Sequence, residues 1–75
     1  MISVNDELNG LKSRLQALGL RVTKFEKIGN GNMSAFRVYF YYPDEDVLQE
    51  GFFWRHDMDT FEERMKIKLQ EKAHQ

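Results

Sequence analysis

The feature that most constrains the fold is a strict alternation of side chains between Ser34 and Tyr42. Alternate positions on one side of this run are all large and apolar or aromatic: Phe36, Val38, Phe40 and Tyr42. The intervening positions are Ala35, Arg37, Tyr39 and Tyr41. A period of two predicts a β-strand, over about residues 34–42, whose first set of side chains faces the core.

A second aromatic run, Gly51 to Met58, follows an acidic connector and is expected to pair with the first as an antiparallel hairpin. We predict a strand over about residues 51–57, with Phe52, Trp54 and then His56 facing inward. Phe53, Arg55 and Asp57 would then face outward. Pro43 should end the preceding strand, and the connector reads as a solvated loop around Val47 and Leu48.

Helices are predicted at both ends of the chain. Apolar residues at spacings of three and four predict a helix over about residues 4–18, begun by Ser3 or Asn5 and ended at Gly19. Its stripe is Val4, Leu8, Leu11, Leu15 and Leu18. Asp59 to Glu62 matches a capping box and predicts a second helix over about residues 60–72. Its shared face is Phe61, Met65 and Leu69, with Ile67 off that face.

The segment from residue 21 to residue 28 is rich in β-branched and aromatic residues, but its alternation is broken. A bulge or an edge position in the sheet would explain the break. Gly29 to Asn32 contains an Asn-Gly pair, the typical signal of a tight hairpin.

The predicted fold is therefore a single α+β domain over residues 1–75, in the order α-β-β-β-α. A chain of 75 residues is too short to support two separate cores. The simplest arrangement is a three-stranded antiparallel sheet with both helices packed on one face. The other face of the sheet would be left open to solvent.

This order of elements resembles the double-stranded RNA-binding domain over nearly the whole chain. That family contacts RNA through its first helix, the loop between its first two strands, and lysines that open its second helix. Lys12, Arg14 and the Gly29–Asn32 loop stand at the first two places. The third place holds Asp57, Asp59, Glu62 and Glu63, which would repel phosphates. The resemblance implies a similar architecture without the family's binding signature.

Charge and composition narrow the classes of function. Eleven basic and twelve acidic residues give a net charge of −1, which provides no overall attraction to nucleic acid or to an anionic membrane. The sequence contains no cysteine, no secretory leader pattern and no run of about 20 apolar residues. We expect a cytoplasmic protein that does not enter a membrane.

The outward face of the hairpin is the main candidate for a functional surface. Its predicted members are Arg37, Tyr39, Tyr41, Phe53 and Arg55. They can stabilise the sheet through cross-strand pairs, bind a protein partner or a second copy of the chain, or stack single-stranded nucleic acid. We take protein binding as the function hypothesis and nucleic-acid binding as its alternative.

The acidic residues Asp44, Glu45, Asp46 and Glu50 are predicted to form a patch that assists binding. They lack the order of carboxylates found in an EF-hand, so no metal is expected there. His56 beside Asp57 is the one pair that suggests catalysis, but no nucleophile or phosphate-binding glycine motif accompanies it. We expect a half-buried structural histidine and a protein that is not an enzyme and uses no cofactor.

Overall fold

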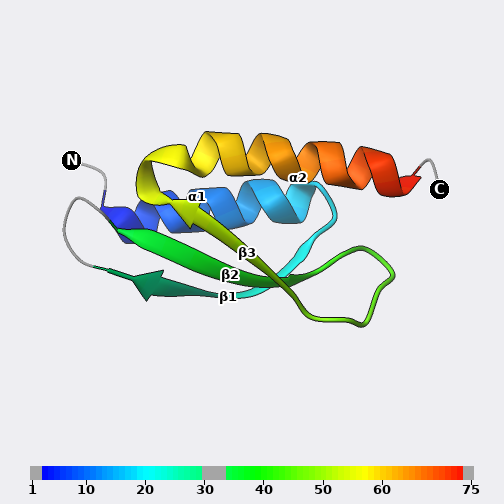
Figure 1. Cartoon of the computed structure of the whole chain (residues 1–75), viewed down its shortest axis with the longest axis horizontal. Helices are drawn as coiled ribbons and strands as arrows, with labels where there is room; N and C mark the ends of the chain where they lie inside the picture. Colours follow the sequence, from blue (N-terminus) through cyan, green and yellow to red (C-terminus); the bar gives the residue numbers. More distant parts are fainter. Residues whose placement is uncertain (1–2, 30–33, 74–75) are drawn as a thin grey trace.

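The computed structural model describes residues 3–29 and 34–73 and has the predicted order of elements (Figure 1). Those elements are α1 (Val4–Ala17), β1 (Arg21–Ile28), β2 (Ala35–Tyr41), β3 (Gln49–Trp54), a short 3-10 helix (Arg55–Asp57) and α2 (Met58–Ala73). The predicted α+β class and the α-β-β-β-α order are confirmed.

The strands form one antiparallel sheet in the order β1-β2-β3, so the alternating strand β2 is central. Figure 1 shows α1 and α2 lying side by side on the same face of the sheet. The predicted core face of β2 is confirmed, because Phe36, Val38, Phe40 and Tyr42 are all buried. Among the described residues, no helix is long and apolar enough to cross a lipid bilayer.

The two ends of α1 follow from local chemistry. The Ser3 hydroxyl accepts a hydrogen bond from the Asp6 amide at 3.2 Å and caps the first turn. Gly19 takes a positive φ of 103°, which lets the Leu20 amide donate back to the Leu15 carbonyl at 3.2 Å. This closure buries Leu20 in the same apolar cluster as Leu15, and the predicted end of the helix at Gly19 is confirmed.

The broken alternation of β1 has both of the predicted causes. The register with β2 shifts between Val22 and Lys24, and β1 lies at an edge of the sheet. The hairpin predicted at Gly29–Asn32 falls largely on residues 30–33, outside the described residues. The antiparallel pairing of β1 with β2 on either side of it is present.

The predicted phase of β3 is wrong. The strand spans Gln49–Trp54, and Phe53 is 1% exposed, whereas Phe52 and Trp54 are 47% and 37% exposed. Gly51 faces inward opposite Val38, directly beneath the Phe61 ring of α2. Phe53 faces the same way and packs against the rings of Phe25, Phe36 and Phe61, at centroid distances of 6.1, 5.7 and 4.9 Å.

The second helix also begins earlier than predicted. The chain leaves β3 through the 3-10 helix, and α2 starts at Met58, so Asp59 lies in its first turn and does not precede it. A carboxylate in the first turn still interacts favourably with the helix dipole. Phe61 and Met65 are buried and Leu69 packs against the core, whereas Ile67 is 52% exposed. The predicted apolar face of this helix is therefore correct.

Replacing Gly51 by alanine is expected to destabilise the fold. The added Cβ would lie 2.8 Å from the Phe61 ring and 3.1 Å from Val38 Cγ1, inside a packed core. Overpacking of this kind lowers the free energy of unfolding by about 1–3 kcal/mol. Urea denaturation followed by circular dichroism measures the change.

Gly10→Ala is the matched control, with an expected effect of opposite sign. Gly10 lies within α1, and its added Cβ would meet only the end of the Arg14 side chain, at 3.4 Å. Alanine in a helix interior is more stable than glycine by about 0.5–1 kcal/mol. Equal effects of the two substitutions would contradict the close packing at Gly51.

Candidate interaction surface

The face of the sheet turned away from the helices, called the open face below, is defined by the strand register. Cross-strand partners share a face, so the neighbours of Arg37, Tyr39 and Tyr41 lie beside them. The aromatic residues of the open face are Tyr39, Tyr41, Phe52 and Trp54. Its charged residues are Arg21, Lys24, Glu26, Arg37 and Glu50.

Three of the five predicted site residues, Arg37, Tyr39 and Tyr41, occupy this face. The prediction is wrong for Phe53, whose place on the open face is taken by its neighbours Phe52 and Trp54. Three consecutive aromatics give either phase of the strand a buried ring, so alternation alone does not decide between them. Gly51 is the signal that identifies the phase, because its missing side chain leaves room for a helix.

The prediction is also wrong for Arg55. The strand ends at Trp54, and Arg55 begins the 3-10 helix, which turns its side chain toward the helices. There its guanidinium donates two hydrogen bonds to the Glu7 carboxylate of α1, at 3.1 and 3.3 Å. This pairing raises the pKa of Arg55. Arg55 therefore joins α1 to the end of the sheet and does not belong to the open face.

Cations lie over the tyrosines of the open face. The Arg21 guanidinium carbon is 5.0 Å from the centroid of the Tyr41 ring, and Lys24 Nζ is 4.9 Å from that of Tyr39. Arg37 Nη1 lies 3.6 Å from Glu26 Oε1. The pKa of Arg37 is raised, first by a hydrogen bond with Tyr39 and further by the charge of Glu50. The positive charge of this face is thus largely balanced by its own carboxylates.

A strip of exposed rings runs along β3. Phe52 and Trp54 meet edge to face at 5.6 Å, and the Trp54 ring stacks on His56 at 6.4 Å with an interplanar angle of 18°. The His56 side chain is 67% exposed, so the prediction of an inward, half-buried histidine is wrong. His56 Nε2 lies 3.6 Å from the Asp57 carboxylate, an exposed pair outside any enclosed cavity.

The four predicted acidic residues lie on two elements of the structure. Asp44, Glu45 and Asp46 lie in the loop before β3, whereas Glu50 lies within β3, opposite Tyr39 on the open face. The Glu45 carboxylate pairs with Lys72 Nζ at 3.0 Å, and its carbonyl accepts a hydrogen bond from Arg21. Glu45 therefore ties the loop to α2 and β1, which leaves Asp44 and Asp46 as the outward carboxylates of the loop.

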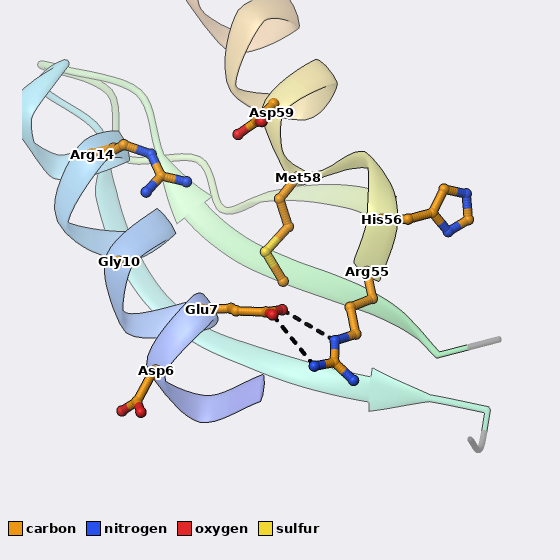
Figure 2. Close-up of a pocket in the computed structure, with 8 residues that line it drawn as sticks. All are labelled: Asp6, Glu7, Gly10, Arg14, Arg55, His56, Met58 and Asp59. Atoms are coloured by element: carbon orange, nitrogen blue, oxygen red, sulfur yellow. Dashed lines mark hydrogen bonds and ion pairs between the residues drawn. The ribbon is translucent and has the colours of Figure 1, made fainter. Parts of the chain in front are cut away.

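A groove of about 390 Å³ separates α1 from the segment that leads into α2 (Figure 2). It is lined by Asp6, Glu7, Gly10, Arg14, Arg55, His56, Met58 and Asp59. Figure 2 shows Arg55 reaching across it to Glu7, with His56 pointing away. Arg14 Nε donates to Glu62 Oε1 at 2.6 Å. The charged side chains at the groove thus connect α1 with α2 and with the 3-10 helix. No group of three metal-ligating side chains occurs among residues 3–29 and 34–73.

Comparison of the chain with protein-family models, with curated proteins and with solved structures found no match. The resemblance to the double-stranded RNA-binding domain therefore stays at the order of elements. The acidic residues Asp57, Asp59, Glu62 and Glu63 stand in the 3-10 helix and the first turns of α2, where that family has lysines.

Glu62→Gln is expected to lower the free energy of unfolding at neutral pH by about 0.5–1 kcal/mol, the upper part of the range for partly exposed ion pairs. The hydrogen bond from Arg14 lowers the pKa of Glu62 in the folded state. The stabilisation is therefore present above the ordinary value of 4.5 and is lost as the pH falls below it, through the folded-state pKa. Urea denaturation across this pH range measures the difference between wild type and variant.

Glu63→Gln provides the control, because the Glu63 carboxylate is 66% exposed and pairs with Lys66 on the same helix. Its effect is expected to be smaller than that of Glu62→Gln. A constant difference between wild type and Glu62→Gln down to about pH 3 would contradict the ion pair as the source of the stabilisation.

Proposed function

We propose that the chain is a small, non-catalytic interaction module that binds a protein partner through the open face of its sheet. One observation carries the proposal: tyrosine, tryptophan, phenylalanine and arginine side chains lie together on a face that neither helix covers. Tyrosine, tryptophan and arginine are the residues that contribute most to binding in protein interfaces.

The geometry of the open face supports this assignment. Its side chains project from a sheet whose other face packs against the core, so the binding groups are held in place before a partner arrives. Binding then costs less conformational entropy than it would for side chains on a mobile loop. Phe52 and Trp54 are half exposed, and covering their apolar area contributes about 25 cal/mol per Å².

The charges around the open face would guide a partner. Asp44 and Asp46 extend from the loop next to β3, and surface charges of this kind raise association rates more than they raise affinity. The cytoplasm is the proposed location, because the sequence contains neither cysteine nor a run of about 20 apolar residues.

The double substitution Tyr39→Ser, Tyr41→Ser is expected to abolish capture of the partner from an extract of the native host. It removes two rings from the centre of the open face, where a loss of about 2 kcal/mol or more per anchor residue is typical. Affinity purification with wild type and variant side by side measures the loss. Sedimentation equilibrium of the purified chain decides whether a second copy is the partner.

Ile67→Ser is the matched surface control for this experiment. Ile67 is an exposed apolar residue of α2, away from the open face. It should capture the same partner as wild type. If Ile67→Ser loses the partner and the tyrosine variant retains it, the open face is not the binding surface.

Single-stranded nucleic acid is a second candidate ligand of the same face, favoured by the interleaving of cations with aromatic rings. The cations already lie over Tyr39 and Tyr41, and Glu26 and Glu50 offset their charge, so protein binding is the better fit. We therefore expect no salt-sensitive change in Trp54 fluorescence when single-stranded oligothymidylate is added at low salt. Quenching that salt reverses, and that Arg37→Gln weakens, would replace protein binding by nucleic-acid binding.

A further inference from the structure

The two edges of the sheet differ in how well they are protected against pairing with another strand. Within residues 3–29 and 34–73, β1 and β3 each have a strand neighbour on one side only. Natural proteins block such edges with charged side chains, bulges or proline. The edge with less of this protection is the one that can accept a further strand.

The β1 edge carries the usual protection. Its register with β2 is interrupted between Val22 and Lys24, and the unpaired Thr23 turns its hydroxyl to the Tyr39 carbonyl at 3.0 Å. Charged side chains continue along the strand through Lys24, Glu26 and Lys27. An irregular, highly charged edge is a poor template for another strand.

The β3 edge has little of this protection. Gln49–Trp54 contains one charged residue, Glu50, and neither a proline nor a register shift. The Arg55 amide donates to the Ser34 carbonyl at 3.0 Å, which sets the phase of hydrogen bonding between β2 and β3. Because antiparallel bonding alternates, the backbone groups of Glu50, Phe52 and Trp54 point away from β2, toward the free edge.

A groove of about 380 Å³ runs beside this edge, between β3 and α2. Its apolar floor includes Phe40, Phe61 and Met65, and its rim on α2 carries Arg64 and Lys68. Neither cation forms an ion pair with any residue in the described part of the chain. The inward side chains of an added strand would enter this groove and meet two cations.

We propose that the β3 edge binds an extended, acidic segment of a partner protein, which adds to the sheet as a fourth strand. The backbone of the segment pairs with Glu50, Phe52 and Trp54, its inward carboxylates reach Arg64 and Lys68, and its outward apolar side chains lie beside Phe52 and Trp54. This site is the edge and its groove, and it shares only Phe52 and Trp54 with the open face, so pairing at the edge does not require binding at Tyr39 and Tyr41.

The cations Arg64 and Lys68 also disfavour a second copy of the chain as the partner at the β3 edge. A two-fold pair of β3 edges would place each α2 beside the α2 of the other copy, because a two-fold interface brings the same surface of both copies together. The rims of Arg64 and Lys68 would then face their own equivalents and repel each other. An acidic strand meets the same rim with attraction.

Two labelled peptides test the proposal by fluorescence anisotropy: acetyl-Thr-Glu-Val-Glu-Val-Glu-Thr-amide and the same peptide with lysine in place of every glutamate. The acidic peptide is expected to bind and the basic peptide to bind at least about tenfold more weakly. In amide NMR spectra of the chain, Glu50, Phe52 and Trp54 should shift more than Gly51 and Phe53. Absence of binding up to about 1 mM peptide, or equal binding of both peptides, would overturn the proposal.

Two variants separate the charges from the backbone. The double substitution Arg64→Gln, Lys68→Gln is expected to weaken binding of the acidic peptide by about tenfold. The double substitution Lys12→Gln, Lys27→Gln removes the same charge from α1 and β1 and should leave the binding unchanged. Glu50→Pro removes an edge amide without breaking a bond to β2 and should abolish binding, while Glu50→Gln retains it.

Each contrary result identifies what fails. The edge site would be overturned if a folded Glu50→Pro variant still bound the peptide. It would also be overturned if only the Tyr39 and Tyr41 amides shifted, because the peptide would then lie on the open face. If Glu50→Pro does not fold, the pattern of amide shifts in the wild type decides the same point. Self-association of the wild type that excludes the peptide would assign the edge to a second copy.

Discussion

The contact between the Phe61 ring and Gly51 sets the geometry of the rest of the molecule. It lets α2 lie close against β3, and it places Gly51 and Phe53 on the inner face of that strand. Phe53 then forms the centre of a cluster to which β1, β2 and α2 each contribute one ring: Phe25, Phe36 and Phe61. A short chain without disulfides thus builds its core from aromatic packing between elements.

The same contact decides what the outside of the sheet looks like. Since Phe52, Phe53 and Trp54 are consecutive, turning the middle ring inward turns the other two outward. The exposure of Phe52 and Trp54 is therefore a consequence of where α2 packs, whether or not a partner binds them. Tyr39, Tyr41 and Arg37 have a different origin, because they lie on β2 and contact Lys24, Arg21 and Glu26 of the neighbouring strand β1.

Elements with a single clear period were predictable from the sequence, and elements with two competing patterns were not. The leucine stripe and Gly19 defined α1, and the alternation of β2 defined its core face, because in each case one arrangement buries the apolar set. The phase of β3 depends on the packing of α2 against Gly51, which the alternation of its three consecutive aromatic residues does not record. Arg55 was misplaced for a related reason: the strand ends at Trp54, where the 3-10 helix turns the chain toward α1.

The register shift in β1 has a consequence for how copies of this fold can accumulate. A sheet grows into a fibre only when each added strand exposes a fresh edge at the far side of the next molecule. Here one edge is irregular and charged, so any pairing through the other edge ends after a single step. Because β1 is irregular, pairing through the β3 edge can form only closed assemblies. Exposed aromatic residues beside β3 are therefore tolerated without fibre growth.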